Sequence, residues 1–83
     1  MARLLFFGRL TDQSGGRERA LTLPEGGCSV SAVVETLAGS DAALGDALRD
    51  PSIRAALNGA FVDADAIVTE NDELAFLPPA SGG

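Results

Sequence analysis

The chain has 83 residues, 46% of them apolar, which is enough for one folded domain with a single core. Its net charge is −6 and all six basic residues are arginine, a balance that argues against binding to nucleic acid or to an anionic membrane. With no histidine and one cysteine, it lacks the usual general base and the ligands of a zinc site. An enzyme built from Asp and Glu alone stays open, but we expect a reactant in chemistry done by other proteins, with no metal or bound cofactor.

The first part of the chain predicts two antiparallel strands. Residues 3–8 are almost continuously apolar and end at Gly8, which indicates a strand. Residues 11–16 are turn-forming, and residues 17–23 alternate polar and apolar, as in an edge strand with one wet face.

A Pro-Glu-Gly-Gly break at residues 24–27 precedes the main predicted helix. Either Ser29 or Ser31 can cap this helix, and Gly39 marks its expected C-terminal end. Its apolar stripe has helical spacing but is rich in β-branched residues, so the helix depends on packing against a sheet; the stripe is Val30, Val33, Val34 and Leu37.

The remaining elements are shorter. Asp41 can cap a second helix that stops at Asp50-Pro51, and residues 53–57 predict a third strand. Asn58-Gly59 is a strong hairpin signal, with residues 60–62 as the return strand. After a turn at residues 70–72, residues 73–77 form the last predicted strand.

This order of elements predicts an α+β fold with a mixed sheet packed on one main helix, which matches a ubiquitin-like β-grasp roll. The domain is expected to span residues 1–77, followed by an extended tail of residues 78–83 that ends in Gly-Gly.

The first and last strands each have apolar residues on both faces, although only one face of the sheet can meet the helix. We expect Phe7 and Leu77 on the exposed face, with Phe61 as a neighbour from the short return strand. A loop that covers this face is the alternative; a docking patch for another protein is the interpretation we favour.

The tail begins with Pro78-Pro79, which cannot continue a strand and holds the chain extended. Ala80 and Ser81 are small, and Gly82 and Gly83 can enter a channel too narrow for other residues. Because chain ends are often frayed, a tail without function is the alternative.

Residues 4–8 (Leu-Leu-Phe-Phe-Gly) and 71–83 (Asn-Asp-Glu-Leu-Ala-Phe-Leu-Pro-Pro-Ala-Ser-Gly-Gly) resemble the family of molybdopterin synthase small subunits. The likeness in length and element order spans essentially the whole chain, and residues 26–53 are its least distinctive part. The resemblance implies a sulfur carrier with a ubiquitin-like fold.

The resemblance further implies that an ATP-dependent activating enzyme adenylates Gly83, and that a sulfur donor system converts the adenylate to a thiocarboxylate. The loaded tail, residues 78–83, then inserts into the synthase large subunit and donates sulfur to cyclic pyranopterin monophosphate. The family assembles as a heterotetramer, and its docking residues match Phe7, Phe61 and Leu77. Phe61 is a conservative departure, since the family often has Leu there.

Two other functions stay open. The chain could carry sulfur for thiamine, cysteine or tRNA thiolation, or it could be a ubiquitin-like interaction module whose tail is inert. The Phe-Leu-Pro-Pro-x-Ser-Gly-Gly ending favours the molybdopterin pathway.

Cys28 lies just before the main helix and could carry sulfur itself, but inert packing is the expectation. Asp63, Asp65, Glu70 and Asp72 lack the spacing of a calcium loop and are expected to be solvated turn residues. A single cysteine suits a reducing compartment, and the apolar run near the start is too short for a signal or a membrane span; we therefore expect a cytoplasmic protein.

Overall fold

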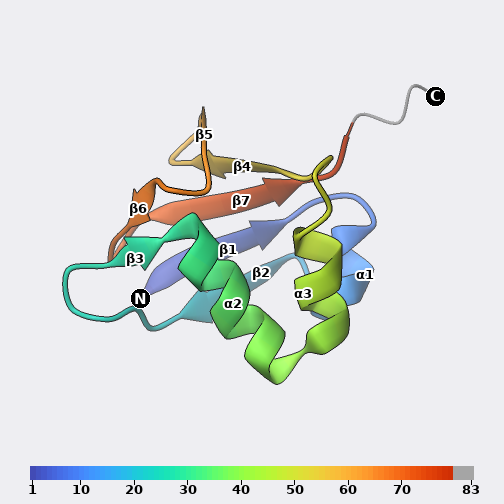
Figure 1. The fold of residues 1–83 in the computed structure, drawn as a ribbon, viewed down its shortest axis with the longest axis horizontal. Coiled ribbons are helices and arrows are strands. Elements are labelled where there is room, and N and C mark those ends of the chain that lie inside the picture. Colours follow the sequence, from blue (N-terminus) through green and yellow to red (C-terminus); the bar gives the residue numbers. More distant parts are fainter. Residues whose placement is uncertain (80–83) are drawn as a thin grey trace.

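The computed structural model describes residues 1–79, in which a five-stranded sheet lies under two helices (Figure 1). The strand order is β2-β1-β7-β4-β5, and a separate two-stranded sheet pairs β3 with β6. The strands are β1 (Ala2–Phe6), β2 (Glu18–Leu21), β3 (Cys28–Ser29), β4 (Arg54–Leu57), β5 (Ala60–Val62), β6 (Ile67–Val68) and β7 (Glu73–Leu77). The helices are α1 (Leu10–Ser14), α2 (Val30–Ser40) and α3 (Ala42–Leu48).

The centre of the large sheet pairs the first strand with the last in parallel, and its other pairings are antiparallel. Leu4 pairs with Leu74 and Phe6 with Phe76, and all four side chains are buried beneath α2. The Phe6 and Phe76 rings stack with centroids 5.8 Å apart. The predicted α+β class, with a mixed sheet packed on one main helix, is confirmed.

Helix α2 begins at Val30 and is capped by Ser29, one of the two predicted capping residues. The Ser29 hydroxyl accepts a hydrogen bond from the Ala32 backbone N–H (3.0 Å), which satisfies one of the free donors of the first turn. The predicted apolar stripe is buried in the core: Val30, Val33, Val34 and Leu37. Because β-branched residues have a low intrinsic helix propensity, this packing is what stabilises the helix.

The expected end of this helix at Gly39 is wrong. The helix continues to Ser40, and Asp41 then ends α2 and begins α3. The Asp41 N–H donates to the Leu37 carbonyl (2.9 Å), while its carboxylate accepts from the Leu44 N–H (3.1 Å). One residue therefore caps both helices, and a glycine C-cap is not needed.

Three short elements were not predicted. Residues 11–16, expected as a turn, contain most of α1, which is anchored by the fully buried Leu10 and ends at Gly15 with φ +81°. Strands β3 and β6 have two residues each, too few to show an alternating pattern.

The Asn58-Gly59 hairpin between β4 and β5 is confirmed. Asn58 has φ +50° and Gly59 has φ +89°, the left-handed conformations that a two-residue turn requires. The Asn58 side-chain amide donates to the Asp72 carboxylate (3.0 Å), and its oxygen accepts from the Glu73 N–H (2.9 Å). The hairpin is thereby fixed to the start of β7.

Candidate functional site

One face of the large sheet packs on α2, and we call the opposite side the outer face. In register, Leu5 lies beside Ala75, Ala75 beside Ala56, and Ala56 beside Phe61, so small and apolar side chains run across four strands. Strand alternation assigns six apolar residues and one arginine to the centre of the outer face: Leu5, Phe7, Arg54, Ala56, Phe61, Ala75 and Leu77.

The predicted exposure of the two aromatic residues is confirmed. Phe7 is 37% exposed and Phe61 is 58% exposed, whereas Leu77 is half-buried between its neighbours. Ala75 is almost fully covered because Leu5 and Ala56 flank it in register. The face is thus an apolar surface with two protruding rings, suitable for contact with another protein.

Arg54 is a residue of this face that sequence analysis missed. It lies opposite Leu77 in register, and its guanidinium carbon is 3.9 Å from the centroid of the Phe61 ring. The sequence contained the information needed to place Arg54 on this face. Arg54 and Ala56 are two residues apart in one strand and so lie on the same face, and the hairpin brings Phe61 beside that strand. Only the register between strands shows that the two side chains meet.

The tail leaves the sheet at a close contact. Gly8 has φ +58°, and a Cβ at this position would lie 2.8 Å from Pro78 Cγ. Pro78 is half-buried and Pro79 is exposed. Glycine at residue 8 therefore permits both the backbone turn after β1 and the close approach of the first tail residue. The other predicted tail residues, Ala80, Ser81, Gly82 and Gly83, lie outside the described residues.

Cys28 is half-buried in β3, where it pairs with Val68 and contacts the core. The carboxylates of Glu70 and Asp72 make structural bonds instead of gathering around a common point. Asp72 accepts from the Thr69 N–H (2.8 Å), which is the main reason its pKa is lowered. Within residues 1–79 no group of three or more Cys, Asp or Glu side chains is placed to hold a metal ion.

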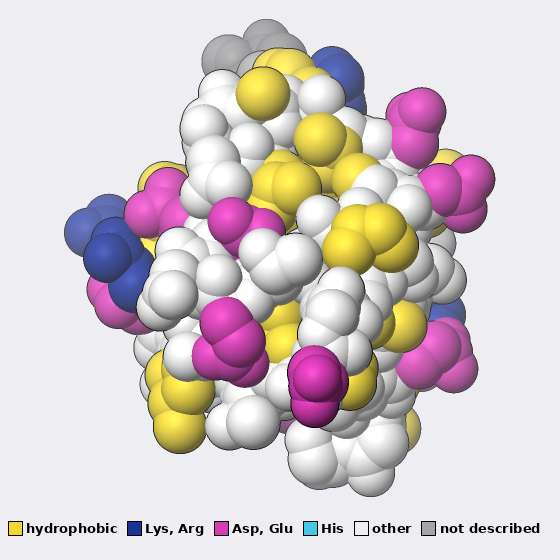
Figure 2. Space-filling view, turned by 90° about the vertical axis from the view of Figure 1, so that its left-hand side faces the viewer, with side chains coloured by type: hydrophobic (Ala, Val, Ile, Leu, Met, Phe, Trp, Pro, Cys, Tyr) yellow, Lys and Arg dark blue, Asp and Glu magenta, His cyan; other side chains and the backbone are white. Residues whose placement is uncertain are grey.

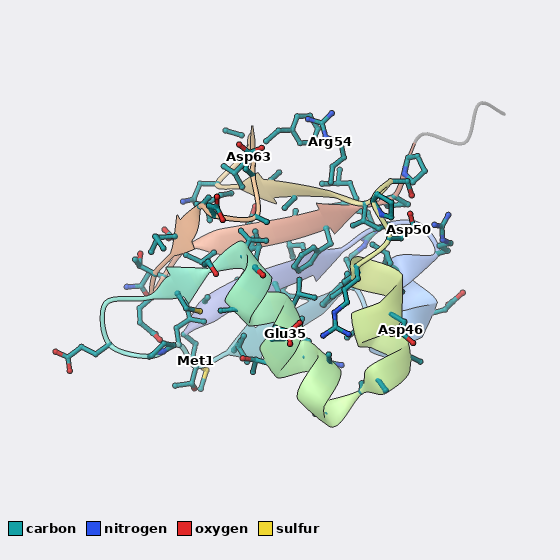
Figure 3. All side chains as sticks on the ribbon, viewed as in Figure 1. Met1, Glu35, Asp46, Asp50, Arg54 and Asp63 are labelled. Atoms are coloured by element: carbon teal, nitrogen blue, oxygen red, sulfur yellow. The ribbon has the colours of Figure 1, made fainter. Side chains whose placement is uncertain are left out.

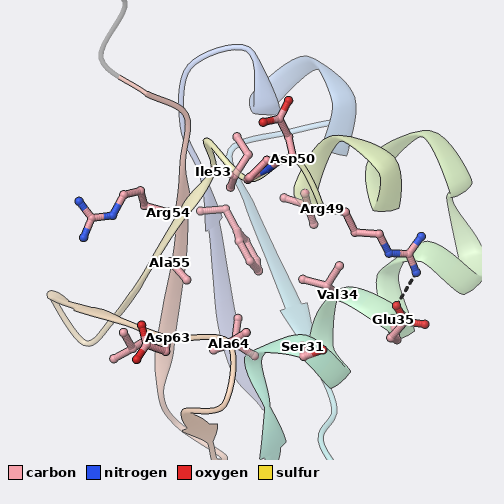
Figure 4. A pocket seen from close by; sticks show the side chains of 15 residues that line it. Ser31, Val34, Glu35, Arg49, Asp50, Ile53, Arg54, Ala55, Asp63 and Ala64 are labelled. Carbon is pink, nitrogen blue, oxygen red and sulfur yellow. Dashed lines mark hydrogen bonds and ion pairs between the residues drawn. The ribbon is translucent and has the colours of Figure 1, made fainter.

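A groove of about 490 Å³ lies on the helical side of β4 and β5, with a floor that includes Val34, Ile53 and Phe76. Glu35 and Arg49 form an ion pair at its rim (Figure 4). Arg54 is the one residue that the groove shares with the outer face, and no residue predicted to be functional lines it.

The surface agrees with the net charge of −6: the end of the molecule seen in Figure 2 shows more carboxylate than guanidinium groups, with apolar atoms between them. Among the helices of the described part of the chain, none has the length and apolar character needed to cross a membrane.

The fold and site define the class of the protein as a ubiquitin-like β-grasp domain, and comparisons with known proteins agree. The structure matches SAMP1 from Haloferax volcanii with a TM-score of 0.84 and 25% identity, covering 99% of this chain and 98% of that chain. It matches CysO from Mycobacterium tuberculosis with a TM-score of 0.77 and 17% identity, covering 96% and 100%. The latter likeness shows the fold alone.

The sequence comparisons define the family. The model of the ThiS family matches residues 4–83. The molybdopterin synthase sulfur carrier subunit of Escherichia coli (strain K12) is 33% identical over 85 residues, which cover the whole of both chains. The chain therefore belongs to the ThiS family, and its predicted resemblance to the small subunit of molybdopterin synthase is confirmed.

Proposed function

We propose that this chain is a sulfur carrier that works through the carboxylate of Gly83, as the non-catalytic small subunit of a molybdopterin synthase. The observation on which the proposal rests is the full-length match to a sulfur carrier subunit, together with a family match that extends to Gly83 itself. The chain is then a reactant, and the catalytic groups belong to its partners.

The chemistry begins with a carboxylate, which is a poor electrophile. An ATP-dependent activating enzyme transfers AMP to the Gly83 carboxylate and releases pyrophosphate, which makes a reactive mixed anhydride. A donor system then supplies sulfur at the oxidation level of sulfide, which attacks the acyl carbon of Gly83, displaces AMP and leaves a thiocarboxylate. No side chain of the carrier has to act as a base, which suits a chain without histidine.

Delivery uses the two parts of the candidate site. The outer face docks through Phe7, Phe61 and Leu77 onto the synthase large subunit, and the stem formed by Pro78 and Pro79 directs the tail toward the active site. The loaded Gly83 then donates sulfur to cyclic pyranopterin monophosphate. Two small and two large subunits form a heterotetramer in the cytoplasm.

The position of the docking residues supports this division of roles. Leu77 on the outer face is followed directly by Pro78, so a partner bound to this face also lies at the base of the tail. The contact between Gly8 and Pro78 fixes where the stem starts relative to Phe7, the residue next to Gly8. Docking and insertion are therefore geometrically linked.

The test is reconstitution of sulfur transfer. The chain is loaded with ATP, activating enzyme and a sulfur donor, then mixed with the large subunit and cyclic pyranopterin monophosphate, and molybdopterin is measured in a single turnover. We expect one product per two loaded chains, because the dithiolene contains two sulfur atoms. A loaded chain that delivers sulfur only to a cysteine, thiamine or tRNA acceptor would assign it to one of those pathways instead.

A further inference from the structure

Arg54 extends the outer face beyond its apolar residues. It is also one of the residues that line the groove, but its guanidinium points to the side of β4 opposite the Glu35–Arg49 pair (Figures 3 and 4). The guanidinium lies 3.9 Å from the centroid of the Phe61 ring, within the range of a cation–π contact. A stacked guanidinium has few rotamers left, so the charge is held beside Phe61 before any partner arrives.

Among the described residues, Arg54 takes part in no ion pair. Arg3, on the same face, pairs with Glu18 (3.2 Å) and Glu73 (3.0 Å), and Arg49 on the helical side pairs with Glu35. Around Arg54, by contrast, the described residues place no carboxylate within the 4.0 Å of an ion pair. In a chain of net charge −6, this leaves an unpaired cation beside the apolar residues Phe61 and Leu77 of the proposed docking surface.

The geometry indicates what such a cation binds. The contact with the Phe61 ring covers one side of the guanidinium, and the N–H groups that point away from the ring stay available. Those groups match the two oxygens of a carboxylate, which they bind in a bidentate manner. A partner that covers Phe61 and Leu77 removes water from around Arg54. The ion pair between Arg54 and a partner carboxylate is then stronger, and a partner without such a carboxylate binds less well because it leaves Arg54 unpaired.

We propose that Arg54 and Phe61 form a specificity-determining pair: the protein that docks on the outer face presents an Asp or Glu carboxylate to Arg54, next to apolar residues that cover Phe61. This inference rests on the proposed function, in which that protein is the synthase large subunit. The apolar contacts supply docking, and the carboxylate selects the partner.

The experiment measures the dissociation constant for the large subunit by calorimetry, at low and at high salt. Arg54→Glu is expected to weaken binding by about 30-fold or more, because it places two carboxylates together. Arg54→Leu keeps the apolar contact and is expected to lose about tenfold and most of the salt dependence. Arg17→Glu is the control: it changes the net charge equally at the far edge of the sheet, before β2, and should change binding less than about threefold.

A second arm identifies the carboxylate. Large-subunit variants with one surface Asp or Glu changed to Arg are tested against the Arg54→Glu chain, and at least one should restore binding. If Arg54→Glu binds as Arg17→Glu does, or if no charge reversal restores binding, the specificity pair is wrong while the carrier function stands. If the unaltered chain does not bind the large subunit, the proposed function fails and this inference fails with it.

Discussion

Gly8 and Pro78 meet where the tail leaves the sheet, so closely that a Cβ on Gly8 would lie 2.8 Å from Pro78 Cγ. Gly8 follows β1 and Pro78 follows β7, the two strands that pair in parallel at the centre of the sheet. The contact joins the outer face to the stem, and it explains why a glycine with φ +58° stands at this position.

Gly8→Ala should therefore strongly reduce the rate of sulfur transfer while it lowers the free energy of unfolding only slightly. The left-handed backbone costs alanine about 1 kcal/mol, and the new methyl group displaces Pro78 and the stem. We expect transfer to the large subunit to slow by about tenfold or more, because a shifted tail presents Gly83 in the wrong place. Single-turnover transfer at saturating large subunit measures this effect.

The control is Gly26→Ala, which has a similar backbone conformation (φ +84°) but no atom within 4 Å of the new Cβ. It should lose a comparable amount of stability and keep its transfer rate. Equal transfer rates for the two variants would show that the Gly8 contact does not position the tail.

The outer face is tested by Phe7→Asp and Leu77→Asp. Each should weaken binding to the large subunit by more than about 2 kcal/mol, the loss expected for an apolar anchor at an interface. Ile67→Asp, which alters a more exposed apolar residue (54%) on β6, should leave binding within about 0.5 kcal/mol. Circular dichroism checks the fold, and unchanged binding of both folded outer-face variants would exclude this face from docking.

The acid stability of the domain depends on the turn before β7. The pKa of Asp72 is lowered mainly by its hydrogen bond from the Thr69 N–H, and the pKa of Glu70 mainly by its hydrogen bond from the N-terminal amine. A lowered folded-state pKa contributes stability above the ordinary pKa of the group, and this is lost as the pH falls through the lowered value. We expect stability to be nearly constant from about pH 7 to pH 5 and to fall below about pH 4.

Urea unfolding of the unaltered chain and of Asp72→Asn at several pH values measures this dependence. Asp72→Asn should be less stable at neutral pH, and the difference should shrink in acid, where Asp72 is protonated in both states. A difference that does not change with pH would mean that the charge of Asp72 does not contribute.

Sequence periodicity predicted the elements that build the core. Phe6 and Phe76 stand in strands long enough to show their pattern, and Val33 and Leu37 have helical spacing. Helix α1 was missed because Thr11 and Ser14 suit a turn as well as a single helical turn, and only the burial of Leu10 decides between the two.

The parts of the site that were missed depend on contacts between distant segments. Arg54 is an ordinary strand residue until the hairpin places Phe61 beneath its guanidinium. The sequence indicated only that Gly8 ends a strand, whereas the structure shows that it also lies against Pro78. For Phe7 and Leu77 the face of the sheet was predicted correctly, since strand alternation alone assigns them to the face opposite α2, although Leu77 is half-buried there.

Cys28→Ala distinguishes a thiol route from a carboxylate route. Cys28 is half-buried in β3, which lies in the smaller sheet beside the start of α2. If sulfur is carried on Gly83, the folded variant should load and deliver sulfur at close to the normal rate. Single-turnover transfer by Cys28→Ala, with intact mass to confirm loading, makes the measurement, and lost transfer would assign the sulfur to the thiol.

The most direct test of the carrier function is the mass of the chain after incubation with ATP, activating enzyme and a sulfur donor. If Gly83 carries the sulfur, the mass should increase by the difference between one sulfur and one oxygen atom, located at Gly83 by fragmentation. The chain without Gly83 should show no such gain, although its stability should differ by less than about 0.5 kcal/mol because the described core is built from residues 2–76. An unchanged mass for the full chain, or equal loading and transfer by the shortened one, would show that Gly83 does not carry the sulfur.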